Sequence, residues 1–248
     1  MAWFSIAYAL FAYVVFLATT LWAVAFLGDW PLLTASINRG PASPPGEALA
    51  VNLGLFLLFG LQHSVMARQR FKRWWTQWVP APVERATYVL AASLCLALLL
   101  WQWRPMPSPV LWSVETPAGR LALQALGWAG WILLGLSSWL LDHFALFGLR
   151  QPWVARQGRP MPDAPFRTPL LYRHVRHPIY LGFLVAFWAT PDMTAGHALF
   201  AAASTAYILV GVAFEERDLL REFGPRYRDY QRRVGMLLPR WPWPRNGR

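Results

Sequence analysis

The sequence has little charge and almost no cysteine. Only 14% of its 248 residues are charged, whereas 56% are hydrophobic and 16 are tryptophan. This composition excludes an ordinary soluble domain. Cys95 is the single cysteine, which rules out an intramolecular disulfide and a cysteine-rich metal site. It lies in an apolar segment, and we interpret it as a small core residue. The composition indicates a polytopic membrane protein.

Two further signals are missing from the sequence. The amino terminus has neither the basic region nor the cleavage site of a secretory signal, and its apolar run is longer than that of such signals. We expect it to remain attached as a membrane span. No Gly-x-Gly-x-x-Gly fingerprint occurs, so a nucleoside cofactor would have to bind at the ends of membrane helices.

Long apolar runs predict an all-α fold, a polytopic helical bundle with five full spans and a short hairpin segment. About 20 apolar residues cross the bilayer core as a helix. The expected full spans are residues 3–27, 47–66, 84–103 and 121–141, followed by the run that ends near Phe214. Segment 178–190 has 13 residues, which at ~1.5 Å per residue is too short for the ~30 Å core.

The formal charge of +11 would suit a nucleic-acid partner, but the positions of the basic residues favour a lipid bilayer. Segments 68–85, 148–177 and 215–248 hold 20 of the 23 lysines and arginines, and the loops between them hold the other 3. The positive-inside rule therefore places these segments and both termini in the cytoplasm. We expect an integral protein of the bacterial inner membrane.

The turn Arg176-His177-Pro178 and the pair Glu215-Glu216 flank the short hairpin. Pro178 suits the first position of a helix, with His177 outside as its cap, and the free N–H groups of that first turn attract a carboxylate or phosphate. Small residues repeat every fourth position on both arms of the hairpin, so we expect the arms to pack closely. The hairpin then returns Glu215 and Glu216 to Arg176. The chain between residues 150 and 176 is rich in proline, and we expect no regular helix there.

Polar residues also interrupt two spans, as Gln62-His63-Ser64 and as Asp142-His143. Polar groups at this depth are costly unless satisfied, and they frequently mark function. His63 is either a histidine bonded to a neighbouring helix or a functional group. Asp142 either orients His143 or, like it, marks only the interface.

Several motifs in order resemble the isoprenylcysteine carboxyl methyltransferase superfamily of membrane enzymes, which also includes NnrU-like proteins. They are Arg176-His177-Pro178-x-Tyr180-x-Gly182, Glu215-Glu216-x-x-Leu219 and Gly224-x-x-Tyr227-x-x-Tyr230. Gln62-His63-Ser64 and Asp142-His143-Phe144 are similar to its methanethiol S-methyltransferase branch. The resemblance covers nearly the whole chain and implies a single membrane methyltransferase domain, residues 1–248, whose cofactor-binding part spans about 170–240.

The resemblance further implies S-adenosyl-L-methionine as cofactor and a small thiol, methanethiol, as the substrate that becomes dimethyl sulfide. The expected cofactor-binding residues are Arg176, His177, Pro178, Tyr180, Leu181, Gly182, Glu215 and Glu216. The expected substrate-binding residues are Gln62, Ser64 and Asp142. Catalytic candidates are His63 and His143, as cation or base near the thiol, and Arg217 as an electrostatic alternative.

The sequence is also compatible with other hypotheses about the substrate, the glutamate pair and the two histidines. The substrate could instead be a prenylated cysteine or a lipid. Glu215 and Glu216 could form only a salt-bridge network with Arg217 and Arg221. A non-enzymatic binding or assembly protein could use His63 and His143 to hold haem, although that reading leaves the Arg-His-Pro turn and the glutamate pair unexplained. No obligate protein partner is evident.

Overall fold

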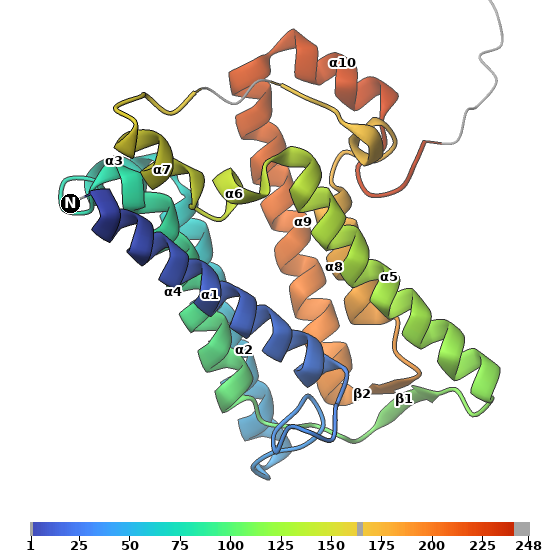
Figure 1. Ribbon diagram of the computed structural model, residues 1–248. Helices are drawn as coiled ribbons and strands as arrows, with labels where there is room; N and C mark the ends of the chain where they lie inside the picture. Colours follow the sequence, from blue (N-terminus) through green and yellow to red (C-terminus); the bar gives the residue numbers. More distant parts are fainter. Residues whose placement is uncertain (1, 163–165, 241–248) are drawn as a thin grey trace, which may run out of the picture.

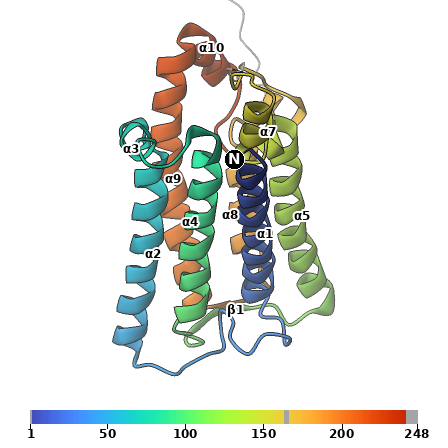
Figure 2. The ribbon, with the colours of Figure 1, turned by 60° about the vertical axis from the view of Figure 1, so that its left-hand side comes forward.

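Five long apolar helices form the body of the protein (Figure 1). The computed structural model describes residues 2–162 and 166–240, and within them five helices are long and apolar enough to cross a membrane. They are α1 (Ala2–Leu27), α2 (Pro45–Ala67), α4 (Ala81–Gln102), α5 (Pro117–Leu141) and α9 (Ala195–Phe223). Figure 2 shows them roughly parallel in one bundle. The prediction of an all-α membrane bundle with five spans is confirmed.

Proline marks the start of many of these helices. It occupies the first or second position of α2, α4, α5, α8 (Pro178–Trp188) and α10 (Pro225–Arg233). A helix tolerates proline there because the N–H groups of its first turn have no intrahelical acceptor. The segment that joins α5 to α8 contains two short helical pieces, α7 (Arg150–Arg156) and the 3-10 turn η1 (Leu170–Arg173). The expectation of no regular helix between residues 150 and 176 was therefore wrong for the seven residues of α7. Pro152 lies in the first turn of α7 and is tolerated there. Residues 163–165 of that segment, including Pro165, lie outside the described ranges.

The short hairpin segment is α8 (Pro178–Trp188), which has 11 residues. At ~1.5 Å per residue it spans about half of the apolar core, as predicted. Its small-residue face packs on α5, however, and not on α9 as expected. A Cβ added at Gly130 of α5 would lie 2.6 Å from the Ala186 nitrogen, and one added at Gly182 would lie 2.7 Å from the Gly130 oxygen. Ala202 and Ala206 of α9 are exposed.

This close contact predicts that Gly130→Ala destabilises the bundle. The new methyl group would meet the backbone of α8, and such overpacking typically costs about 1–3 kcal/mol. Gly135→Ala is the matched control because it lies on the same helix with nothing within 4 Å of the new Cβ. Thermal melting in detergent should show a lower midpoint for Gly130→Ala than for Gly135→Ala. Equal midpoints would refute the contact.

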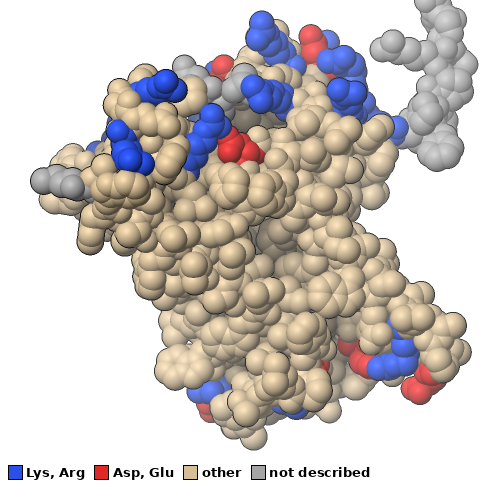
Figure 3. Space-filling model, viewed as in Figure 1, with Lys and Arg blue, Asp and Glu red and all other residues tan. Residues whose placement is uncertain are grey.

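Short helices and most of the basic residues gather at one end of the bundle. These helices are α3 (Gln69–Trp75), α6 (His143–Leu146), α7 and α10 (Pro225–Arg233). Figure 3 shows lysine and arginine side chains over this end, an uncharged band across the middle, and a few charges at the other end. This is the distribution that a membrane protein requires, since the apolar band faces lipid.

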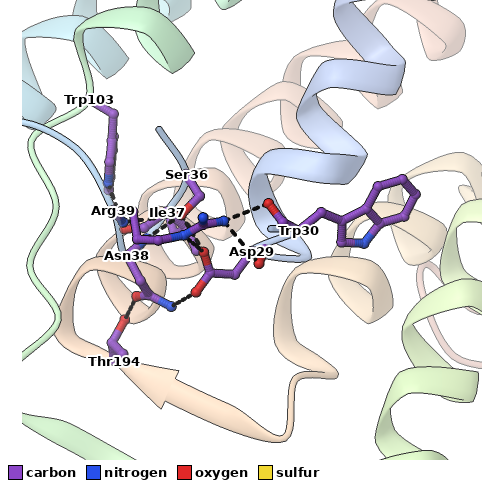
Figure 4. Close-up of polar contacts among 8 residues, drawn as sticks. All are labelled: Asp29, Trp30, Ser36, Ile37, Asn38, Arg39, Trp103 and Thr194. Carbon is purple, nitrogen blue, oxygen red and sulfur yellow. Dashed lines mark hydrogen bonds and ion pairs between the residues drawn. The ribbon is translucent and has the colours of Figure 1, made fainter. Parts of the chain in front are cut away.

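The opposite end is closed by an ordered loop and a strand pair. β1 (Val110–Ser113) pairs antiparallel with β2 (Asp192–Thr194), which the sequence did not predict. In the loop between α1 and α2, Asp29 accepts hydrogen bonds from Ser36, from Asn38 Nδ2 at 3.1 Å and from Arg39 Nε at 2.9 Å (Figure 4). The network holds Ile37, which is fully buried, in the core beside Trp103.

Acid is expected to weaken this loop. Burial raises the pKa of Asp29, but the hydrogen bonds from Ser36, Arg39 and Asn38 outweigh it and lower the pKa below its usual 3.8. A carboxyl group with a lowered folded-state pKa stabilises the fold above its unfolded pKa, and this contribution is lost as the pH falls through the folded pKa. The wild type should therefore melt above Asp29→Asn by a constant margin above about pH 5, and the margin should shrink below 3.8. A margin that persists at the lowest pH would contradict the role of the carboxylate.

Candidate active site

A buried ion pair joins the Arg-His-Pro turn to the end of α9. Both Nε and Nη2 of Arg176 lie 2.7 Å from Glu216 Oε1. The two side chains are only 8% and 16% exposed. Nη1 of Arg176 donates to the carbonyl oxygens of Val234, at 2.5 Å, and Gln231. The guanidinium is therefore occupied by the protein on all three nitrogens.

His177 lies beside this pair, at the N-cap position of α8 that the sequence predicted. Its Nε2 is 3.1 Å from Glu216 Oε1, and its Nδ1 is 3.7 Å from Glu215 Oε2. The backbone N–H groups of Arg176 and His177 donate to the carbonyl oxygens of Gly235 and Met236. The chain after α10 thus fixes the turn, and Pro178 then starts α8 in a buried position.

Helix α10 supplies further partners to Glu216. Gln231 Nε2 donates to Glu216 Oε2 at 2.9 Å, and the Tyr227 hydroxyl lies 3.5 Å from Oε1. Burial and the neighbouring Glu216 raise the pKa of Tyr227, so its hydroxyl stays protonated and can donate. Tyr230 donates to the Tyr172 carbonyl oxygen. Tyr227 and Tyr230, which the sequence analysis quoted only as part of a motif, are both buried on one face of α10. Gln231 was missed because nothing in a charged helix distinguishes it from solvent-facing residues.

Glu215 differs from its neighbour Glu216. Its side chain is 44% exposed, and its ionic contact, with His177, is long. The ring of Tyr180 lies 5.7 Å from that of His177, in the neighbourhood of Glu215. The structure therefore separates the two carboxylates: Glu216 holds the turn together, and Glu215 remains accessible to a cation at the same place.

The Gln62-His63-Ser64 motif faces tyrosines on two other helices. His63 Nε2 lies 2.8 Å from the Tyr88 hydroxyl of α4, and Ser64 Oγ lies 3.1 Å from the Tyr207 hydroxyl of α9. Within the described part of the chain, Gln62 bonds only inside its own helix, to Met66 Sδ. Sequence reasoning missed Tyr88 and Tyr207, although a tyrosine inside an apolar span requires a partner for its hydroxyl. That requirement was a usable signal.

The Asp142-His143 motif makes a different set of contacts. His143 Nε2 lies 2.7 Å from the Tyr13 hydroxyl, and its Nδ1 lies 2.9 Å from Ser138 Oγ. Asp142 caps α6 by accepting from the Ala145 nitrogen at 3.0 Å, and it pairs with Arg150. Asp142 therefore caps a helix and does not orient His143, so that alternative was wrong. Its carboxylate oxygens are taken up by the Ala145 nitrogen and by Arg150, which explains the outcome.

Tyr180 connects the two parts of the site. Glu215 on one side and Tyr88 and Tyr207 on the other are among the groups near its hydroxyl, and its ring lies 5.7 Å from that of His177. The His63 cluster and the accessible carboxylate therefore lie in one neighbourhood, formed by α2, α4, α8 and α9. His143 makes its contacts with α1 and α5 instead.

The remaining sequence candidates have simpler surroundings. Arg217 is exposed, with its guanidinium 5.7 Å from the centre of the Phe214 ring. Leu181 is partly buried. Gly182 contacts Gly130 and Leu134 of α5, so its lack of a side chain serves helix packing. Its assignment to the cofactor site stays a prediction.

Curated relatives match almost the entire chain. The methanethiol S-methyltransferase of Mycobacterium tuberculosis is 55% identical over 238 residues, which cover 96% of each protein. Methanethiol S-methyltransferase 2 of Bradyrhizobium diazoefficiens is 54% identical over 233 residues, or 94% of this chain and 89% of that protein. Nurim of Pan troglodytes is 33% identical over 187 residues, or 69% of this chain and 68% of that protein. No family model and no solved structure matches the chain.

Proposed function

This chain belongs to the methanethiol S-methyltransferase family, and we propose that it methylates methanethiol with S-adenosylmethionine and releases dimethyl sulfide. The main support for this activity is sequence identity: the chain is more than half identical, over 94% or more of its length, to proteins named methanethiol S-methyltransferase. The membrane bundle and the clustered site at its basic end agree with a cofactor that is made in the cytoplasm.

S-adenosylmethionine supplies a methyl group on a sulfonium, and it carries an ammonium and a carboxylate. Glu215 suits the ammonium, because its carboxylate is accessible and has no short ionic partner among the described residues. Arg176 does not suit the carboxylate while Glu216 and two carbonyl oxygens occupy it, so we assign it a positioning role. The N–H groups in the first turn of α8 remain for the carboxylate, as a helix N-terminus favours anions.

His63 is the better placed of the two histidines to act on the thiol. Its neighbourhood includes Tyr180, which also lies near the proposed cofactor ligand Glu215. Both ring nitrogens of His143 are bonded to protein groups, which leaves neither free for a thiol or for a haem iron. The haem-binding alternative therefore loses one of its two ligands.

The test combines binding and product analysis. Purified protein in detergent is given S-adenosylmethionine with methanethiol, hydrogen sulfide or a prenylated cysteine, and headspace dimethyl sulfide is measured beside methylated lipid. We expect dimethyl sulfide from methanethiol, and cofactor binding by calorimetry. Methylation confined to the prenylated cysteine would overturn the substrate, absence of cofactor binding would overturn the donor, and a Soret band would favour haem binding.

The orientation of the protein follows from its charge. It is an integral membrane protein, and we propose that the basic end in Figure 3 faces the cytoplasm of a bacterial inner membrane. The reason is that 20 of the 23 lysines and arginines lie in segments 68–85, 148–177 and 215–248. Green fluorescent protein fused after Gly158 should fluoresce, and alkaline phosphatase fused after Gly40 should be active. The reverse pattern would invert the topology.

A further inference from the structure

The imidazole of His63 has one bonded and one unbonded nitrogen. Nε2 lies 2.8 Å from the hydroxyl of Tyr88, a side chain only 6% exposed. Nδ1 is buried, and it has no hydrogen-bond partner within residues 2–162 and 166–240. A buried polar atom without a partner costs free energy, so it calls for a functional explanation.

Counting unsatisfied groups identifies the tautomer. If Nε2–H donated to Tyr88, the phenol hydrogen would lack an acceptor and Nδ1 would lack a donor, leaving two buried groups unsatisfied. If Tyr88 donates to Nε2, the ring hydrogen sits on Nδ1 and is the only unsatisfied group. The second arrangement is favoured because each unsatisfied group costs about 1–3 kcal/mol. His63 therefore presents an N–H donor at Nδ1.

We propose that this Nδ1–H donates a hydrogen bond to the sulfur of the thiolate substrate, and that Tyr88 is the positioning residue that fixes the tautomer. The inference rests on the proposed methyl transfer and names the group that recognises its substrate. His63 thereby stabilises negative charge on sulfur and is not a base. Tyr88 acts through His63.

The surroundings of His63 suit a small thiolate with an apolar group. The Phe59 ring stacks on the imidazole with centroids 5.4 Å apart, and the rings of Tyr88 and Tyr207 lie 5.0 Å and 6.2 Å away. These rings give apolar walls for a methyl group. The Arg85 guanidinium lies 5.0 Å from the centre of the Tyr88 ring and adds positive charge that favours an anion.

The step balances without a protein base. The thiol releases its proton to bulk water as the thiolate binds. A lone pair of the thiolate sulfur then forms the new carbon–sulfur bond, while the old bond between the methyl group and the donor sulfonium breaks and leaves its electron pair on that sulfur. The Nδ1–H group keeps its proton throughout, and the negative charge it stabilises disappears with the sulfonium charge.

Substituting His63 separates a donor from a base. The amide of His63→Asn places an N–H near the Nδ1 position but cannot take a proton, whereas His63→Ala offers neither. Loss of a hydrogen bond to a charged group lowers affinity about 10- to 150-fold. We expect a loss of that size in kcat/KM for methanethiol at neutral pH in His63→Ala, and kcat/KM within about tenfold of wild type in His63→Asn. Equal, severe losses in both variants would overturn the proposal in favour of a base.

Tyr88→Phe tests the positioning role. This variant should lower kcat/KM for methanethiol. Tyr8→Phe is the matched control and should not lower it: the Tyr8 hydroxyl donates a hydrogen bond of 3.0 Å to Thr87, which lies on the same helix as Tyr88. Calorimetry should show wild-type cofactor affinity in all of these variants, which separates failure of this inference from failure of the proposed function.

The tautomer itself gives a readout independent of activity. Nitrogen-15 spectra of histidine-labelled protein should contain an Nδ1–H imidazole signal that belongs to His63. This signal should be absent in His63→Asn and should shift toward the Nε2–H form in Tyr88→Phe. A wild-type His63 in the Nε2–H form would overturn the assignment.

Discussion

Glu216→Ala is expected to lose cofactor binding and to melt well below the wild type. The substitution leaves the buried guanidinium of Arg176 without its counter-ion, and removing one partner of a buried pair costs about 3–5 kcal/mol. His177 and Gln231 lose their acceptor at the same time. The melting midpoint should fall by about 10 °C or more, and affinity for S-adenosylmethionine should fall because the turn that forms the proposed site is no longer held in place.

Glu222→Ala is the control for this prediction. Glu222 lies on the same helix and is exposed, so its removal should change neither quantity. Differential scanning fluorimetry and calorimetry in the same detergent measure both. A Glu216→Ala protein that melts and binds like Glu222→Ala would show that the ion pair does not hold the turn.

Much of the architecture was predictable because membrane spans depend on run length. Apolar runs located all five long helices, and the 13 residues of segment 178–190 were correctly judged too short to cross. Gly224 and Pro225 disfavour a continuous helix, and α9 ends and α10 begins at these two residues. These features follow from local chemistry alone.

The partners of each helix could not be predicted in the same way. A helix that is apolar all around carries no periodicity to show which face meets which neighbour. The small-residue face of α8 was recognised, but it was matched to α9, the next helix in the chain, when Gly127 and Gly130 give α5 the complementary surface. The strand pair was missed because its two segments are three and four residues long and about eighty positions apart.

The site was predicted in outline and not in its division of roles. Motif spacing brought Arg176, His177 and the glutamate pair together, and the structure confirms that they meet. The sequence could not show that all three nitrogens of Arg176 are occupied by Glu216 and by the carbonyl oxygens of Gln231 and Val234, because backbone carbonyl groups carry no sequence signal. Tyr88 and Tyr207 join the site from α4 and α9 through tertiary contacts only.

The two glutamates should consequently respond differently to the same substitution. Glu215→Gln keeps the size and hydrogen-bonding capacity of the side chain but removes its charge. Because Glu215 is 44% exposed and its one ionic contact is 3.7 Å long, the melting midpoint should stay close to that of the wild type. The proposed ammonium partner is lost, and hydrogen bonds to charged groups contribute about 1.5–3 kcal/mol.

Affinity for S-adenosylmethionine is therefore expected to fall roughly 10- to 150-fold in Glu215→Gln. S-adenosylhomocysteine, which keeps the ammonium but lacks the sulfonium, should lose affinity by the same factor. Glu222→Gln controls for the loss of one negative charge from α9. Unchanged affinity for both ligands would remove Glu215 from the cofactor site. A loss confined to S-adenosylmethionine would place the Glu215 carboxylate beside the sulfonium. The sulfonium charge is the charge that S-adenosylmethionine carries and S-adenosylhomocysteine does not.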